Sequence, residues 1–187
     1  MSTGHSSETA IRATYARASQ NLPGTGAIVV LKLGDDSSDL AFGTGAQPEQ
    51  LVSLPLGLGV LADRYFPAGH LSELLIEHAI AEVEDIVMPW HGKLPSAATL
   101  FTDDAAVAEL VRWAGMPEDP DSWRLTTEAV EQLFNRWAAL AQGRPASQDP
   151  LPTTGRFSAT LLVLREWLHH LGFDGITLLL QRSSAGR

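Results

Sequence analysis

The sequence contains no cysteine among its 187 residues. This absence excludes disulfides, thiolate nucleophiles, Cys-ligated zinc, iron–sulfur clusters and haem attached through cysteine. Long apolar runs are also missing, since no stretch approaches the roughly 18 consecutive apolar residues of a membrane span, and residues 1–25 hold no run of signal-peptide length. We therefore expect a soluble, cytoplasmic protein with no membrane insertion.

Basic residues are scarce. Lys and Arg together number 13 against 22 Asp and Glu, which gives a net charge of −9, and only two of the basic residues are lysines. No Lys/Arg cluster is present to meet a phosphate backbone, so we do not expect nucleic-acid binding. Hydrophobic residues make up 44% and charged residues 19% of the chain, a composition typical of a globular protein. The length predicts one domain over residues 1–187, with residues 1–5 and 182–187 as flexible tails.

The longest helical pattern runs from His70 to Trp90. Pro89 disfavours helical backbone at Met88, so the helix should end or kink there. The side of this helix opposite its apolar face carries two strips of ionisable side chains. We interpret the helix as the central helix of a single core, and its apolar face is formed by Leu71, Leu75, Ile76, Ala79, Ile80, Val83, Ile86 and Val87.

One polar strip of this helix is a candidate metal or acid/base site. His78 and Glu82 are four residues apart and Asp85 lies one turn further, so the three side chains can point toward one ion. The spacing is neither that of zincins nor that of di-iron bundles, so a solvated helix face is the favoured interpretation and no cofactor is expected. In the alternative interpretation, His78, Glu82 and Asp85 bind a transition metal, supported by Glu77 and by His91 or His170.

Two glycine-containing stretches suggest other ligands. Gly43-Thr44-Gly45 follows a strand pattern, but Pro48 replaces the third glycine of a dinucleotide motif, and the acidic residue at a suitable distance, Asp63, lies inside a helical pattern. A nucleotide site is therefore not expected there. In the second stretch, Leu54 to Gly59, two glycines would allow another backbone to come close, and the segment could instead form the wall of an apolar pocket.

The order of the predicted elements indicates an α+β fold. We expect a single domain with a small, mostly antiparallel sheet of about four strands packed with six helices. The first two strands should form a hairpin, and residues 116–123 should form an acidic loop. The predicted helices are 8–20, 55–66, 70–88, 104–114, 127–142 and 157–171, and the predicted strands are 27–33, 39–42, 97–101 and 176–180.

The sequence offers no convincing nucleophile–base pair, established metal spacing or phosphate loop. We therefore predict a non-catalytic accessory, assembly or regulatory protein that acts through protein–protein contacts. It should form a homodimer, and a larger enzyme is a further potential partner. The five tryptophans could be interface anchors, although Trp113, Trp137 and Trp167 have a spacing that also suits a core. The alternatives are a metal-dependent or acid/base enzyme and a small-molecule binding module.

Overall fold

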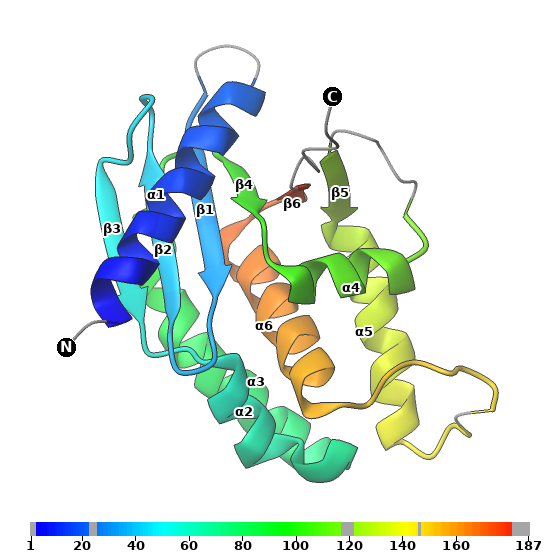
Figure 1. Ribbon diagram of the computed structural model, residues 1–187. Coiled ribbons are helices and arrows are strands. Elements are labelled where there is room, and N and C mark those ends of the chain that lie inside the picture. The colour runs from blue at the N-terminus through cyan, green and yellow to red at the C-terminus, as the bar shows by residue number, and fades with distance from the viewer. Residues whose placement is uncertain (1–2, 23–25, 117–121, 146, 181–187) are drawn as a thin grey trace, which may run out of the picture.

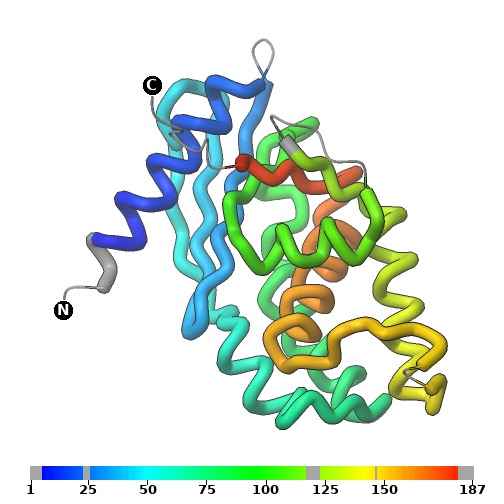
Figure 2. The backbone as a smooth tube through the Cα atoms, turned by 45° about the vertical axis from the view of Figure 1, so that its right-hand side comes forward, coloured from blue at the N-terminus to red at the C-terminus, as the bar shows by residue number. Residues whose placement is uncertain are grey.

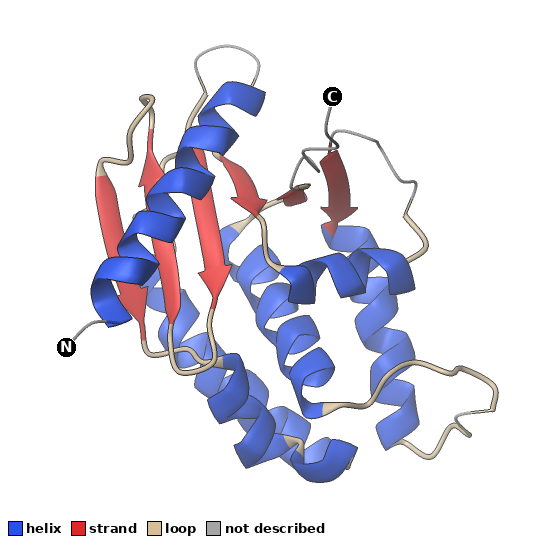
Figure 3. Cartoon of the chain, viewed as in Figure 1, coloured by secondary structure: helices blue, strands red, loops and turns tan. Residues whose placement is uncertain are grey.

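The computed structural model describes residues 3–22, 26–116, 122–145 and 147–180. In these ranges the chain forms one six-stranded sheet, six α-helices and two short 3-10 helices (Figures 1 and 3). In chain order the elements are α1 (Thr3–Asn21), β1 (Ile28–Leu33), β2 (Ser38–Gly43), β3 (Gln50–Leu54), α2 (Leu58–Tyr65), η1 (Pro67–Gly69), α3 (Glu73–Val87), η2 (Met88–Trp90), β4 (Thr99–Thr102), α4 (Ala105–Trp113), β5 (Ser122–Thr126), α5 (Thr127–Ala141), α6 (Gly155–Leu171) and β6 (Gly175–Leu179).

The sheet is mixed, with the strand order β3-β2-β1-β4-β6-β5. The inner strands β1, β4 and β6 run parallel, while β2 and β3 on one side and β5 on the other pair antiparallel. The crossovers that connect the parallel strands contain helices, as parallel pairing requires. The prediction of a small, mostly antiparallel four-stranded α+β sheet is therefore wrong, and the fold is α/β.

Two strands were not predicted, and both belong to the antiparallel parts of the sheet. β3 is an edge strand whose first four residues are exposed or half-buried, so it lacks the apolar alternation of a covered strand. β5, with the sequence SWRLT, occupies the end of the segment interpreted as an acidic loop. Pairing with β2 and β6 supplies the backbone hydrogen bonds that make these segments strands. The carboxylates of that predicted loop, Glu118, Asp119 and Asp121, lie outside the described residues.

Helices cover both faces of the sheet. Figure 2 shows α1 on one side of β1 and β2, with α2, α3 and α6 on the other side. The smaller core lies under α1, where Ile11 and Tyr15 pack on Val30 and Ala41. The larger core lies between the opposite face and the other helices, because alternate residues of β1, such as Val29 and Leu31, point that way.

The most buried helix is α6 rather than the predicted central helix. α6 contacts α2, α3, α4 and α5, and eleven of its residues are buried. α3 begins at Glu73 and buries one side only, through Ile76, Ala79, Val83 and Val87. The apolar face predicted for this helix is thus present, but the helix lies at the outside of the larger core.

The tryptophans are core residues. Trp137 and Trp167 are fully buried, and Trp90, Trp113 and Trp123 are half-buried against the same core. Their burial removes the positive argument for interface anchors. Within the described residues, no helix is both long enough and apolar enough to cross a membrane.

Candidate functional site

The carboxyl ends of β1 and β4 are the natural place for a ligand site in this fold. In open α/β sheets, ligands bind in the crevice outside the carboxyl ends of parallel strands. β1 ends with Lys32 and Leu33, and β4 is followed at once by Asp103 and Asp104. Because β1 and β4 are paired neighbours, residues 71 positions apart in the sequence meet at one edge.

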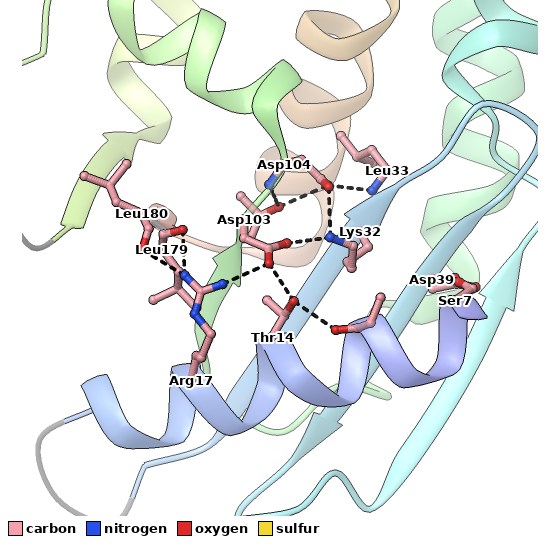
Figure 4. Close-up of polar contacts among 12 residues, drawn as sticks. Ser7, Thr14, Arg17, Lys32, Leu33, Asp39, Asp103, Asp104, Leu179 and Leu180 are labelled. Carbon is pink, nitrogen blue, oxygen red and sulfur yellow. Dashed lines mark hydrogen bonds and ion pairs between the residues drawn. The ribbon is translucent and has the colours of Figure 1, made fainter. Parts of the chain in front are cut away.

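Asp103 is the centre of a charged cluster at this edge (Figure 4). Its Oδ1 accepts a hydrogen bond from Lys32 Nζ at 2.5 Å. Its Oδ2 accepts from Thr14 Oγ1 at 2.8 Å and from the Arg17 guanidinium at 3.1 Å. Arg17 also donates to the backbone carbonyls of Leu179 and Leu180 at the end of β6. The cluster thus ties α1 to the carboxyl ends of all three parallel strands.

Asp104 holds the other side of the Lys32 ammonium. Its Oδ1 lies 3.3 Å from Lys32 Nζ, and its Oδ2 accepts from the Leu33 backbone N–H at 2.7 Å and from Thr102 Oγ1 at 3.1 Å. The N–H of Leu33 belongs to the last residue of β1. Asp104 therefore fixes both the end of this strand and the position of the lysine.

The two partners of this pair respond differently to burial. Burial raises the pKa of Asp104 above its ordinary value of 3.8, against the opposing effects of Lys32 and of the hydrogen bonds it accepts. Burial alone would lower the pKa of Lys32, but the two carboxylates outweigh it and raise that pKa. Lys32 is therefore a permanent cation at neutral pH.

The turn between β1 and β2 forms the rim of the site. Gly34 N–H donates to the Ser37 carbonyl at 3.1 Å, which closes the turn. The first N–H groups of α2 donate to this turn, from Leu58 to the Gly34 carbonyl at 2.8 Å and from Gly59 to the Asp35 carbonyl at 3.0 Å. These contacts satisfy helix N–H groups that have no partner within the helix.

Gly57 makes this contact feasible. A Cβ at Gly57 would lie 2.3 Å from the Asp35 carbonyl oxygen, so only glycine permits the approach. The prediction that the glycines between Leu54 and Gly59 allow another backbone to come close is confirmed. Its alternative, a ligand pocket formed by this segment, stays a prediction, and the structure places Leu54, Leu56 and Leu58 in the core.

A hollow of about 230 Å³ lies beside the turn. Among the described residues that line it, Lys32 is the only cation, and three are carboxylates. Asp35 is paired with Arg156, and Asp39 accepts a hydrogen bond from Ser7. A larger hollow of about 690 Å³ between α1 and β2–β3 adjoins it and shares part of its lining. The smaller hollow is lined by Ser7, Lys32, Leu33, Gly34, Asp35, Asp36, Ser37 and Asp39.

The arrangement suits an anionic group that is accompanied by a cation. The lysine and the Ser37 hydroxyl supply hydrogen-bond donors, and the exposed Asp35 and Asp36 supply oxygen ligands of the kind that Mg²⁺ prefers. Asp103 and Asp104 do not line the hollow. They are positioning residues for Lys32.

The predicted metal ligands lie elsewhere, on α3. Glu82 accepts hydrogen bonds from Arg64 at 2.5 Å and from Tyr65 at 2.5 Å, so its carboxylate is already engaged. His78 and Asp85 are exposed. Binding of a metal by His78, Glu82 and Asp85 stays a prediction.

The residues that were predicted to support this metal site do not come together in the structure. Glu77 and His91 are exposed, and the His91 ring is 2.9 Å from the His170 carbonyl oxygen. His170 faces Glu84 and Glu166, neither of which was selected from the sequence. Gly43-Thr44-Gly45 lies at the end of β2 and the start of its connection to β3, where Glu49 accepts hydrogen bonds from Thr44.

The charged cluster at the carboxyl edge was missed by the sequence analysis. A signal was present, because Lys32 is the only charged residue in a strand of six that is otherwise apolar. The acidic pair Asp103-Asp104 was interpreted only as a helix start. Linking the two required the parallel pairing of β1 with β4.

Comparisons with known proteins identify the family and support the fold. The sequence model of the Ppx/GppA phosphatase family matches residues 6–143, from α1 to the end of α5. The crystal structure of the Aquifex aeolicus family member is similar with a TM-score of 0.71 and 17% identity, over 93% of this chain and 58% of that chain. The type II variant of the Aquifex aeolicus Ppx/GppA phosphatase gives a TM-score of 0.70 and 17% identity, over 91% and 58%.

An exopolyphosphatase from Cytophaga hutchinsonii is similar with a TM-score of 0.67 and 13% identity, over 90% of this chain and 60% of that chain. The chain thus spans somewhat under two thirds of the length of these structures. They support the α/β fold with its six-stranded mixed sheet. The prediction of a non-catalytic accessory protein is wrong, because the family match points to an enzyme, as the alternative interpretation had it.

Proposed function

The chain belongs to the Ppx/GppA phosphatase family, and from this premise we propose that it hydrolyses a phosphate ester or phosphoanhydride at the carboxyl edge of β1 and β4. The observation that carries the proposal is the placement of Lys32. It is held by two carboxylates at the ligand edge of the sheet and borders a hollow rimmed by a tight turn. Polyphosphate is the first substrate to test, because similar structures are described as exopolyphosphatases.

In this proposal Lys32 binds and orients a phosphate oxygen. Asp103 and Asp104 fix the ammonium from two sides, so little side-chain freedom is lost when the phosphate binds. The Ser37 hydroxyl, which also lines the hollow, is placed to donate a hydrogen bond to the same group. The lysine remains charged at neutral pH because its carboxylate neighbours raise its pKa.

A divalent cation is part of the proposal. With three carboxylates and one lysine in its lining, the hollow alone would repel a phosphate. The oxygen donors of Asp35 and Asp36 fit Mg²⁺, which commonly takes one or two carboxylates and completes its shell with water and phosphate oxygens. Within the described residues no three carboxylates converge here, which agrees with such a partial protein shell. A bound Mg²⁺ would offset negative charge on the phosphate.

The experiment combines binding and hydrolysis. Calorimetry with tripolyphosphate, with and without Mg²⁺, should show binding that depends on Mg²⁺ and weakens at least about tenfold in Lys32→Met, since one charge-assisted contact is lost. Phosphate release from polyphosphate should fall in parallel. Arg124→Met, which removes an exposed cation on β5, is the matched control and should leave both unchanged. Equal binding by Lys32→Met and the wild type would contradict the proposal.

Location and self-association complete the proposal. A cysteine-free, acidic composition supports a cytoplasmic protein.

Leu74 and Met88 are exposed at 64% and 48% near the two ends of α3, which supports a homodimer through that helix. Light scattering of the purified chain should give twice the chain mass, and a monomer at all concentrations would contradict the dimer.

A further inference from the structure

A second group of ionisable residues lies between α3 and α6, far from the carboxyl edge. Glu84 comes from α3, and Glu166 and His170 are four residues apart on α6. His170 Nε2 lies 2.9 Å from Glu84 Oε1 and 3.2 Å from Glu166 Oε2. In the part of the chain that the structure describes, these three are the one His/Cys/Asp/Glu group whose ligand atoms all lie within 4.8 Å of one another.

Glu166 is the unusual member. Its side chain is 0% exposed, and Oε1 accepts a hydrogen bond from Arg165 at 2.6 Å. Oε2 is buried without a hydrogen-bond partner, because the nearby His170 nitrogen is not aligned for one. A buried carboxylate oxygen without a partner costs free energy. This unpartnered oxygen lies 3.2 Å from His170 Nε2, within the group that Glu166 forms with Glu84 and His170.

A proton on His170 cannot satisfy both carboxylates. Nε2 carries at most one hydrogen, and it faces an oxygen of Glu84 and an oxygen of Glu166. The hydrogen bond goes to Glu84, which leaves the Glu166 oxygen unpaired. A cation at this point would contact all three ligand atoms at once.

We propose that Glu84, Glu166 and His170 bind a divalent transition metal, with Zn²⁺ as the best match. One imidazole and two carboxylates suit Zn²⁺ better than Mg²⁺ or Ca²⁺, which prefer oxygen ligands alone. Zn²⁺ bonds of about 2.0–2.2 Å in a tetrahedron place ligand atoms roughly 3.4 Å apart. The two separations from His170 Nε2, 2.9 and 3.2 Å, are slightly shorter, and Glu84, 40% exposed, has room to move outward.

The surroundings favour this ion. Glu84 and His170 are partly exposed, which gives the metal a route in and leaves a position for a water ligand. The Arg165 guanidinium that contacts Glu166 is shared with Glu131, at 3.2 Å, so its charge is partly offset. The carbonyl of His170 accepts a hydrogen bond from the His91 ring, which holds the end of α6 in place.

The place of the site in the fold assigns it a structural role. His170 precedes the turn into β6, so the site lies near the amino end of that strand, at the edge opposite Lys32. The metal would link α3 to the end of α6, which is the most buried helix. This inference does not depend on the proposed phosphatase activity.

Calorimetric titration of the untagged full chain with Zn²⁺ tests the site. We expect one equivalent per chain and a melting temperature that rises by several degrees when the site is saturated. Glu84→Gln and His170→Ala should each weaken Zn²⁺ binding at least about tenfold and abolish the thermal shift. Glu84 is more exposed than His170, so the Gln variant keeps the test valid if loss of the half-buried imidazole unfolds the protein.

Two matched controls separate this site from other histidines. His169→Ala removes the neighbouring exposed ring on the same helix, and His78→Ala removes the ligand predicted from the sequence; both should bind Zn²⁺ as the wild type does. The proposal is overturned if Zn²⁺ does not bind, if Glu84→Gln binds as tightly as the wild type, or if either control loses the metal.

Discussion

At the scale of single residues, Asp103 holds the site together. Its carboxylate is 11% exposed and accepts hydrogen bonds from Thr14, Arg17 and Lys32. Asp103→Ala removes a carboxylate partner from each of two cations, and we expect it to lower the unfolding free energy by about 2–4 kcal/mol. Urea unfolding measures the loss. Asp174→Ala breaks the exposed pair with Arg124 and should cost about 0–1 kcal/mol, so equal losses in the two variants would contradict this account.

The raised pKa of Asp104 predicts an opposite pH dependence from that of most carboxylates. Above its ordinary pKa of 3.8 the folded state holds a proton that the unfolded state releases, so this group makes stability fall as pH rises toward its folded pKa. Asp104→Asn removes the titration. The unfolding free energy of the wild type minus that of the variant should therefore decrease as pH rises from 3.8.

Asp149 should show the opposite dependence of stability on pH. Its hydrogen bonds from Arg136 lower its pKa, so it stabilises the protein fully above 3.8 and loses this effect as pH falls through its folded pKa. For Asp149→Asn, the unfolding free energy of the wild type minus that of the variant should increase with pH. Urea titrations at a series of pH values where both proteins remain folded measure the two slopes, and slopes of the same sign would refute the assignment.

Little of the site could be predicted from the sequence at this scale. Residue type and spacing singled out His78 and Glu82 as candidate ligands, because their spacing is visible within one helix. Lys32 and Asp103 are 2.5 Å apart, yet their relation depends on strand pairing between distant segments. The same holds for Glu84 and His170, which belong to different helices.

At the scale of elements, the contact between α2 and the β1–β2 turn makes a prediction. Gly57→Ala would place a Cβ 2.3 Å from the Asp35 carbonyl oxygen, and the turn would have to move. We expect a loss of about 1–3 kcal/mol in unfolding free energy and weaker binding at the hollow beside the turn. At Gly45→Ala the nearest atom is 3.9 Å away, so this control should be nearly neutral. Equal effects would show that the helix does not support the turn.

The elements that could be predicted were those whose own sequence has a clear hydrophobic pattern. The helices from Glu73 and Thr127 carry apolar residues three and four apart, and β1 is apolar apart from Lys32, so each was predicted close to its observed bounds. β3 and β5 have neither pattern and become strands only through their neighbours. With both missing, the parallel arrangement of β1, β4 and β6 could not be inferred.

At the scale of the whole molecule, the two proposed sites lie at opposite edges of one sheet. The carboxyl edge carries Lys32 and the acidic turn, and the opposite edge carries the group of Glu84, Glu166 and His170 between α3 and α6. The scaffold between them is the buried α6 packed on the sheet. A change at one edge should therefore leave the other intact, so Lys32→Met should bind Zn²⁺ as the wild type does.

The net charge of −9 predicts an unusual salt dependence for phosphate binding. A basic phosphate-binding protein loses affinity as salt screens the attraction, but here the molecule and the lining of the hollow are both negative. At fixed Mg²⁺, raising NaCl from about 0.01 to 0.1 M shortens the Debye length from roughly 30 to 10 Å, which weakens repulsion more than the contact with Lys32. The association rate of tripolyphosphate, measured by stopped flow, should therefore rise with salt. A falling rate would mean that positive groups beyond the described hollow attract the substrate, and that Lys32 is not its main cationic contact.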